Sequence, residues 1–406
     1  MGERKLRNYI IKMLEKLVSI ETVNPPGLNY DVMAELLKEV LEELGLTVKL
    51  IEIPEHYLNQ HYPYRPRHRG LKRIIVYTRI GYGKLILQFN GHYDVVPSGP
   101  GWSMDPFKLV VKDGKAYGRG TSDMKGGIVA VLATLRSLVD DEIIGKLNGS
   151  IEAVFVPDEE SAGIGTKYFI ERVMKDKPEY VIIPEPTSPR NIVIGHKGLA
   201  RGIIRVYGKQ SHASTPWLGS NAFLKAAKLA LKINREFKRS LASKKSKYPM
   251  EYKRAAYNTL TLGGYALSPV SKESVVPGVF EFSFDIRSIP EENIHHVVNE
   301  FKNIVKSNLH DVDISLLTLL NGVVLENSKL VPILKKGVEE TLGVEPKEVV
   351  SSGRLDVTYY ILKGVEALAY GPGDPRQPHR VDEFIRIRDI MSIVRIYRCL
   401  IDNLLL

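Results

Sequence analysis

Ionisable side chains that could bind a metal or transfer a proton follow three apolar stretches of this sequence. Nearly continuous apolar runs of this length are typical of strands that are buried on both faces of a sheet. In such sheets, ligands bind outside the carboxyl ends of the strands. The sequence therefore predicts a site at one sheet edge, with these contributors: His92 and Asp94 in "KLILQFNGHYD" (84–94), Glu159 and Glu160 in "GSIEAVFVPDEE" (149–160), and Glu185 in "YVIIPEPT" (180–187).

Two loops add an acid and a histidine to this set. Asp123 occupies a Gly-rich turn, "GRGTSDMKGG" (118–127), just before a predicted helix. His379 lies near the C-terminus in the Pro- and Gly-rich segment "YGPGDPRQPHRVDEF" (370–384). Imidazole and carboxylate groups are suitable ligands for zinc and its divalent neighbours. The combined set therefore predicts a metal centre.

Taken singly, each motif also has a simpler interpretation. Asp123 is a favoured helix N-cap residue, and His92 with Asp94 is an ordinary structural polar pair. The acids of "PDEESAGIGT" (157–166) are a solvated loop. Adjacent carboxylates nevertheless repel one another unless a cation neutralises them. Because this acidic run also ends an apolar strand at the expected ligand edge, a metal is the favoured interpretation.

A charge count indicates what such a centre could do. Two divalent ions carry four positive charges, and three carboxylate ligands (Asp123, Glu160 and Glu185) with one bridging hydroxide would neutralise them. A pair of ions lowers the pKa of bound water toward neutrality and stabilises a developing oxyanion. Glu159 then remains to take the proton from that water and pass it to a leaving amine. The expected chemistry is metal-assisted hydrolysis of an amide.

Composition narrows the type of centre and the partners. The only cysteine is Cys399, so neither an internal disulfide nor a thiolate cluster can form, and any metal must be held by histidines and carboxylates. The net charge of +10 comes from scattered basic residues, with local clusters at 61–73 and 238–248. A nucleic-acid binder would need a basic stripe with interleaved aromatic residues, which these clusters fit poorly.

No apolar run approaches the length needed to cross a bilayer. The N-terminal segment "MGERKLRNYIIKMLEKL" mixes charge with helical periodicity and lacks the features of a signal peptide. We therefore expect a cytoplasmic protein with no membrane partner.

The order of predicted elements indicates two domains. Strand–helix alternation predicts an α/β layered domain, with a mixed, mostly parallel sheet flanked by helices, at 1–197 plus 316–406. An inserted α+β domain, with helices on one face of an antiparallel sheet, is expected at 198–315. The predicted helices are 4–20, 30–44, 124–139, 221–237, 292–309, 329–341, 355–363 and a last one from about 386. The predicted strands are 74–80, 84–94, 149–160, 180–187, 199–208, 257–265 and 278–289.

On these motifs the chain resembles the dinuclear-zinc amidohydrolases grouped with acetylornithine deacetylase, succinyl-diaminopimelate desuccinylase, aminoacylase and glutamate carboxypeptidase. The similarity covers nearly the whole chain. It rests on eight motifs in order: "GHYDVVP", "GRGTSDMKGG", "PDEESAGIGT", "PEPT", "GHKG", "SHAS", "FDIRSIP" and the late "GPGD…PHRVDEF". Each motif alone is modest evidence, and their common order is strong evidence.

The resemblance implies a role for each site residue. Glu159 would be the general base and acid, and Asp94 would lie beside the metal ligands. The cofactors would be two divalent ions, with zinc favoured and cobalt as the alternative. The implied metal ligands are His92 and Glu185 for one ion, Glu160 and His379 for the other, and Asp123 bridging both.

The resemblance also gives the inserted domain a function as lid and dimerisation domain. His212 of "SHAS" matches a histidine that reaches across a homodimer to stabilise the tetrahedral oxyanion. Arg287 matches an arginine that receives the substrate carboxylate, a partner that suits a planar guanidinium. Taken without the resemblance, His212 is an ordinary solvated loop histidine and Arg287 a surface salt-bridge residue.

Several positions depart from the family pattern and bear on the substrate. Ser274 replaces a common asparagine that lines the substrate site, and Arg354 and Leu355 are bulkier than the usual small-residue turn. The stretch 54–73, rich in His, Tyr and Arg, looks like an insertion.

The expected activity is hydrolysis of an N-acyl amino acid or a short peptide. Within it, succinyl-diaminopimelate desuccinylation, a step of lysine biosynthesis, is the first expectation, and acetylornithine or acetyl-lysine deacetylation is the second. A metallo-carboxypeptidase or dipeptidase on the same scaffold is an open alternative, because all of these enzymes attack an amide near a carboxylate. A non-catalytic binding protein is disfavoured, since neither the base nor any implied ligand is missing.

Overall fold

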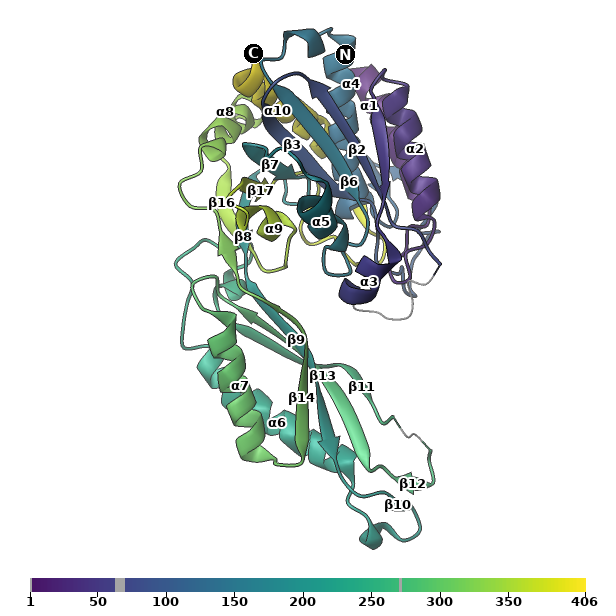
Figure 1. The fold of residues 1–406 in the computed structure, drawn as a ribbon, viewed down its shortest axis with the longest axis vertical. Helices are drawn as coiled ribbons and strands as arrows, with labels where there is room; N and C mark the ends of the chain where they lie inside the picture. The colour runs from purple at the N-terminus through teal and green to yellow at the C-terminus, as the bar shows by residue number, and fades with distance from the viewer. Residues whose placement is uncertain (1, 63–69, 270–271) are drawn as a thin grey trace. The chain divides into compact units, whose positions relative to one another are not determined.

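The computed structural model describes residues 2–62, 70–269 and 272–406. The chain forms two compact units (Figure 1). The first unit contains Met1–Ile194, Leu325–Glu348 and Leu355–Leu406, and the second contains Gly195–Val324 and Val349–Arg354. The expected domain limits, and the role of the inserted domain as a lid, stay predictions. Residues 63–69 of the expected insertion lie outside the described part of the chain.

A mixed sheet forms the centre of the first unit. Its strands, in spatial order, are β1 (Val48–Glu52), β2 (Ile74–Gly81), β6 (Ser150–Val156), β3 (Leu85–His92), β7 (Tyr180–Ile183), β17 (Glu366–Ala369) and β8 (Asn191–His196). The pairs from β6 through β17 are parallel, whereas β1, β2 and β8 pair in the antiparallel sense. The predicted α/β class is confirmed, with the parallel part confined to the middle of the sheet. Strands β15 (Val323–Val324) and β16 (Lys347–Ser351) lie where the chain passes between the units.

Helices cover both faces of this sheet. They are α1 (Glu3–Val18), α2 (Tyr30–Glu42), α3 (Glu55–His61), α4 (Gly126–Asp140), α5 (Ile164–Tyr168), α8 (Leu330–Leu342), α9 (Val357–Ile361) and α10 (Ile387–Leu405). Among the described residues we find no helix whose length and apolar character would let it span a membrane. The predicted helices of this unit are confirmed, with ends that shift by a few residues.

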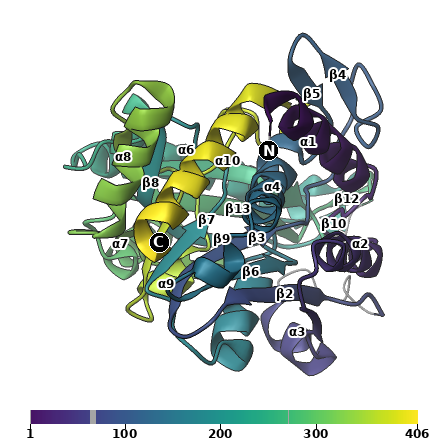
Figure 2. The ribbon, with the colours of Figure 1, turned by 90° about the horizontal axis from the view of Figure 1, so that it is seen from above.

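Strand β3 shows why the sequence of a central strand is a nearly continuous apolar run. On one face Phe89 packs against Tyr397 of α10, with 4.8 Å between the ring centroids. On the other face the Asn90 side-chain amide donates to the hydroxyl of Tyr360 on α9, at 2.7 Å. Figure 2 shows α4 and α10 on one side of the sheet and α9 on the other. Because successive side chains alternate between two covered faces, neither set is exposed.

A three-stranded sheet of the first unit was not predicted. It contains β18 (Phe384–Arg386), β5 (Lys115–Tyr117) and β4 (Val110–Lys112), in that order. Each strand has three residues, which is too short to show a periodic pattern. The sheet brings the segment that follows His379 beside the segment that precedes Asp123.

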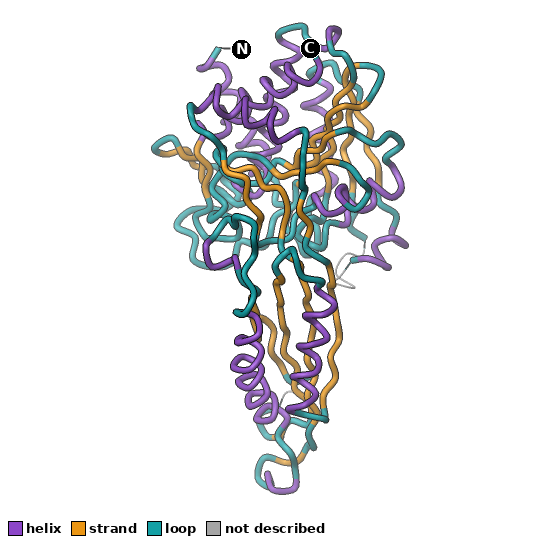
Figure 3. Tube along the Cα trace, turned by 90° about the vertical axis from the view of Figure 1, so that its left-hand side faces the viewer, coloured by secondary structure: helices purple, strands orange, loops and turns teal. Residues whose placement is uncertain are grey.

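The second unit is an antiparallel sheet with two helices on one face (Figure 3). The sheet order is β11 (Thr259–Leu267), β13 (Val279–Ser288), β9 (Gly198–Tyr207) and β14 (Val312–Leu320), and the helices are α6 (Ala222–Leu241) and α7 (Ile294–Asn308). A short pair, β10 (Ser211–His212) with β12 (Val275–Val276), lies outside this sheet. The expected α+β pattern of this segment is confirmed.

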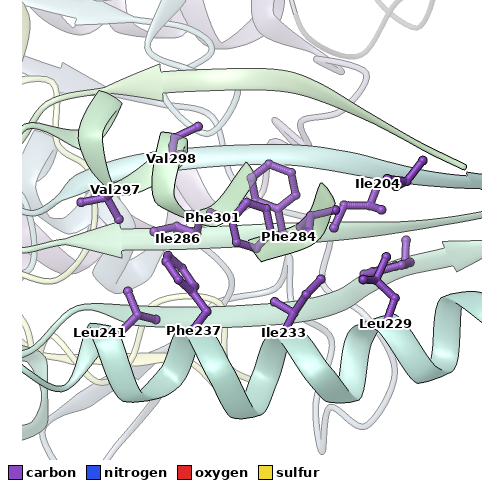
Figure 4. Packing of buried hydrophobic residues seen from close by; sticks show 14 of the residues in the cluster. Ile204, Leu229, Ile233, Phe237, Leu241, Phe284, Ile286, Val297, Val298 and Phe301 are labelled. Atoms are coloured by element: carbon purple, nitrogen blue, oxygen red, sulfur yellow. The ribbon is translucent and has the colours of Figure 1, made fainter. Parts of the chain in front are cut away.

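Aromatic packing forms the core of the second unit. Phe301 of α7 lies between Phe237 of α6 and Phe284 of β13, with ring centroids 5.2 Å and 4.7 Å away. On α6, Leu229, Ile233 and Phe237 recur at the four-residue spacing that places side chains on one helix face. Figure 4 shows these side chains between α6 and the sheet. The unit therefore has its own hydrophobic core.

Candidate metal centre

The five predicted metal ligands converge in the first unit. His92 ends β3, whereas Glu160 and Glu185 lie in the loops that follow β6 and β7. They form two groups that share Asp123: His92, Asp123 and Glu185, and then Asp123, Glu160 and His379. Within each group, one potential ligand atom per residue lies within 4.8 Å of the others. The parallel strands thus deliver their side chains to one edge, as the sequence predicts.

Asp123 lies between the two histidines. Its Oδ1 is 3.2 Å from Nε2 of His92, and its Oδ2 is 3.5 Å from Nε2 of His379. Nε2 of His379 is also 2.9 Å from Oε1 of Glu160, and Nε2 of His92 is 3.8 Å from Oε1 of Glu185. Because the two oxygens of Asp123 face different groups, this carboxylate has the geometry of a bridging ligand.

Buried Glu383 holds the turn that presents Asp123. Its Oε1 accepts the backbone N–H groups of Ser122 and Asp123, at 2.8 Å and 3.1 Å. Its Oε2 accepts the N–H of Gly120 at 3.0 Å and a guanidinium N–H of Arg119 at 2.8 Å. Glu383 is not among the site residues predicted from the sequence. The available signal was an acidic residue four positions after His379, within the same motif.

Gly127 lets this turn approach the loop that carries Glu185. A Cβ atom on Gly127 would lie 1.9 Å from the backbone oxygen of Pro184, which no side chain can tolerate. The start of α4 therefore packs directly on the residue before Glu185. This glycine places the Asp123 turn and the Glu185 loop within one centre.

Replacing Glu383 by glutamine should weaken metal binding about 10- to 100-fold, the usual effect of removing a group that orients a ligand. The amide would turn an NH₂ group toward backbone donors that need an acceptor. The measurement is calorimetric titration of the metal-free protein with zinc. Glu366→Gln is a matched control, because Glu366 also accepts backbone N–H groups, at the start of α8. Equal zinc affinities for the parent and Glu383→Gln would contradict the expectation.

Asp94 contacts both His92 and the acidic loop, the segment after β6 that carries Glu159 and Glu160. The backbone oxygen of Asp94 lies 3.0 Å from Nδ1 of His92, and its carboxylate lies 3.4 Å from the same atom. The carboxylate also accepts the backbone N–H groups of Glu159 and Glu160, both at 3.1 Å. An acceptor at Nδ1 directs Nε2 of the ring toward a metal. Asp94 thus lies beside His92, and its role next to the metal ligands stays a proposal.

The ionisation of the cluster is strongly perturbed. Burial opposes charge on His92, but hydrogen bonding to Asp123 raises its pKa well above the ordinary value. Hydrogen bonds with Asp123 and Glu160 raise the pKa of His379 to about 11. Burial, and then the charge of Asp123, raise the pKa of Glu185 well above its usual range. The raised pKa values favour the protonated forms of these three groups, and metal binding would release those protons.

Glu159 is adjacent to these ligands but belongs to neither ligand group among the described residues. Its side chain is half-buried. Its negative charge contributes to the raised pKa of Glu185, which indicates that the two carboxylates are close. A carboxylate near the ligands but outside both groups is in a suitable place to accept a proton.

His212 and Arg287 belong to the second unit. His212 is exposed on β10, and its Nδ1 accepts the backbone N–H of Ser214 at 3.1 Å. Arg287 lies on β13 and pairs with Asp285, with 2.7 Å between Nε and Oδ1. Their expected catalytic and substrate-binding roles stay proposals.

Several basic groups gather in the second unit around the "GHKG" motif. His196 is buried, and its Nδ1 lies 2.8 Å from the backbone oxygen of Lys197. Burial lowers the pKa of His196 to about 4, helped by the positive charges of Arg354 and Arg287. Burial, together with the charge of Arg287, lowers the pKa of Lys197 to about 8. A histidine with a lowered pKa therefore lies near at least two cationic side chains, Arg287 and Arg354.

The buried His196 should make stability depend on pH. Its pKa is about 4 in the folded protein and 6.5 ordinarily, so the unfolded state binds the extra proton between these values. Ionisation of His196 does not reduce the free energy of unfolding above pH 6.5. As the pH falls from 6.5 toward 4, it lowers the free energy of unfolding by up to about 3 kcal/mol. Urea unfolding of the metal-free protein at about pH 7 and about pH 4.5 measures the loss. It should be smaller in His196→Gln and unchanged in a control, His296→Gln, whose histidine is exposed.

Comparison with known proteins matches this chain to one family. The family described as Peptidase family M20/M25/M40 matches residues 88–403. A protein from Nautilia profundicola named succinyl-diaminopimelate desuccinylase is 27% identical over 408 residues, with 95% of this chain and 98% of the relative covered.

Two solved structures share the fold. One is an M20 family metallo-carboxypeptidase from Sulfolobus solfataricus, with a TM-score of 0.76, 21% identity and 99% coverage of each chain. The other is a dipeptidase from Saccharomyces cerevisiae, with a TM-score of 0.79, 16% identity, and coverage of 98% of this chain and 96% of that chain. The fold therefore extends over essentially the full length of this protein.

Proposed function

This chain belongs to peptidase family M20/M25/M40, and from that premise we propose that it is a deacylase that hydrolyses the amide bond of N-acyl amino acids. Succinyl-diaminopimelate, which would yield succinate and a diamino acid, is the first candidate substrate. The observation that carries the proposal is the pair of ligand groups sharing Asp123, with Glu159 beside them. The desuccinylase names among the curated relatives support the choice of acyl group.

The side chains present fit a pair of divalent cations. His92 and Glu185 would hold one ion, Glu160 and His379 would hold the other, and Asp123 would bind both. The donors are nitrogen and oxygen atoms only, a set that suits zinc first and cobalt second. When bound, the two ions would acidify a water molecule and polarise the scissile carbonyl.

The chain itself would supply the proton transfers. Glu159 would accept a proton from the attacking water and deliver it to the nitrogen of the leaving amine. Because Nδ1 of His212 accepts a hydrogen bond from Ser214, the neutral ring carries its proton on Nε2. That N–H is suited to donate to an oxyanion, which is the role proposed for His212.

A substrate carboxylate would bind near Arg287. The positive charges of Arg287 and Arg354 both lower the pKa of buried His196, so a second cation near Arg287 would strengthen this preference. Arg354 occupies a position where the family pattern has a small-residue turn, so it adds a positive charge that would favour an anionic acyl group. A dicarboxylic acyl group such as succinyl suits this arrangement.

The second candidate function is a metallo-carboxypeptidase or dipeptidase. The fold shared with a carboxypeptidase and a dipeptidase favours it. Both activities need the same water activation and a site for a free carboxylate. Acetylornithine or acetyl-lysine deacetylation differs from the first proposal only in the acyl group.

A hydrolysis screen tests these proposals. Zinc- and cobalt-loaded protein would be incubated with succinyl-, acetyl- and formyl-amino acids and with simple dipeptides. We expect the highest kcat/KM for an N-succinyl substrate. Faster turnover of dipeptides would establish the second candidate instead, and no turnover of any amide by metal-loaded protein would refute both. The homodimer, the cytoplasmic location and the lack of a nucleic-acid partner stay predictions.

A further inference from the structure

A buried polar network is anchored on Asp158, the residue before Glu159. Oδ2 of Asp158 accepts Nε–H of Arg73 at 3.0 Å, and Oδ1 accepts the hydroxyl of Tyr30 at 3.0 Å and the side-chain amide of Asn24 at 3.1 Å. The side chains of Asp158 and Arg73 are fully buried. Asp158 also has a φ of 62°, a left-handed conformation that is uncommon outside glycine. Its side-chain contacts therefore hold a backbone turn that the chain does not favour.

Asn24 joins both ends of the acidic loop. Its Nδ2 donates to Asp158 at 3.1 Å and to Asp94 at 2.9 Å. Its Oδ1 accepts the hydroxyls of Ser161 at 2.7 Å and Tyr62 at 2.8 Å. All four hydrogen-bonding positions of the amide are thus occupied. In sequence, Asp158 and Ser161 directly flank the pair formed by Glu159 and Glu160.

Arg73 is fixed on several sides. Its Nη1 donates to the backbone oxygen of Leu71 at 3.0 Å, and its Nη2 donates to that of Pro26 at 2.5 Å. Its guanidinium carbon lies 5.4 Å from the ring centroid of Tyr30 and 5.0 Å from that of Tyr62. A guanidinium held by hydrogen bonds and two aromatic rings has one available position. It therefore fixes Asp158 in turn.

We propose that Asn24, Arg73 and Asp158 are positioning residues that hold Glu159 and Glu160 in place for the hydrolysis proposed above, on which this inference rests. Asn24 holds both flanks of the pair, and Asp94 accepts the two backbone N–H groups between them. These contacts thereby fix the backbone that carries Glu159, the proposed proton acceptor, and Glu160, a proposed metal ligand. Loosening it lowers kcat, because the base is displaced, and leaves KM nearly unchanged, because substrate contacts lie elsewhere.

Three variants test the network against one control. Asp158→Asn removes the negative charge that pairs with Arg73. Asn24→Asp removes the two N–H donors of the amide and places a third carboxylate against those of Asp94 and Asp158. Arg73→Lys keeps the positive charge but loses the planar guanidinium, whose N–H groups donate to Asp158 and to two backbone oxygens. The control is Glu152→Gln. Glu152 lies on β6, and its buried carboxylate accepts hydrogen bonds from Tyr77 on β2 and Gln88 on β3. Readouts are hydrogen–deuterium exchange of residues 157–163 without metal, zinc affinity, and kcat with KM.

We expect Asp158→Asn and Asn24→Asp to exchange the backbone N–H groups of residues 159–161 about tenfold faster or more. Each should lower kcat about 100-fold at saturating zinc, with KM within about twofold of the parent, as for a misplaced catalytic group. Zinc affinity should fall in both. Glu152→Gln should match the parent in every assay.

Parental exchange rates and kcat in Asp158→Asn and Asn24→Asp would overturn the proposal, as would equal losses in Glu152→Gln. Should either variant fail to fold, Arg73→Lys decides the question in the same assays. The exchange measurement needs neither substrate nor metal. It therefore still tests the network if the parent protein hydrolyses no amide, an outcome that would refute the proposed function alone.

Discussion

Glu159→Gln should lower kcat about 10²- to 10⁴-fold while both metal sites stay intact, the range typical for loss of a general acid–base group. The glutamine side chain has nearly the same shape but cannot accept the proton of the attacking water. Glu159 lies outside both groups of candidate ligands among the described residues, so metal binding should not change. Steady-state kinetics with the best substrate of the screen, and metal analysis of the same sample, measure both effects.

Glu160→Gln is the informative comparison for this prediction. Glu160 is the neighbouring acid, and its Oε1 lies 2.9 Å from Nε2 of His379. Its replacement should reduce metal content as well as turnover, whereas Glu159→Gln should reduce turnover alone. A fully active Glu159→Gln variant, or one that loses metal to the same extent as Glu160→Gln, would exclude Glu159 as the base.

Asp123→Asn should have the largest effect on metal binding. Asp123 is the residue that both ligand groups share, and its two oxygens face different histidines. An asparagine has only one acceptor oxygen, so it cannot serve both groups. We expect loss of at least one bound ion and a fall in kcat/KM on the order of 10³-fold, because water activation and oxyanion stabilisation are both impaired. Elemental analysis after dialysis, and kinetics at added zinc, test this.

Thermal unfolding gives a second measure of the same change. A ligand that binds only the folded state adds about 2.7 kcal/mol of stability when its concentration is 100 times Kd. Zinc should therefore raise the Tm of the parent protein, and raise that of Asp123→Asn much less. Asp105→Asn, which changes an exposed carboxylate in a surface turn, is the control and should respond like the parent. An equal zinc-induced rise in Tm for Asp123→Asn would contradict the bridging role.

The sequence alone was sufficient to predict the elements that carry the candidate ligands. Buried strands are apolar along their length, and ionisable residues at their ends are recognisable without coordinates. His92, Glu160 and Glu185 follow neighbouring strands of the sheet, so their convergence follows from the geometry of a parallel sheet. Asp123 and His379 lie in loops, and their inclusion in the predicted set depended on residue type and on the family resemblance.

The groups that orient these ligands became evident only in the tertiary structure. Glu383 bonds a backbone N–H 260 residues earlier in the chain, and Asn24 bonds Asp158 across 134 residues. Neither contact leaves a periodic or compositional mark, because a hydrogen bond between distant segments depends on how the whole chain folds rather than on local sequence. Residue types thus determined which chemistry is available, whereas the packing of distant segments decided which side chains hold the reactive groups in place.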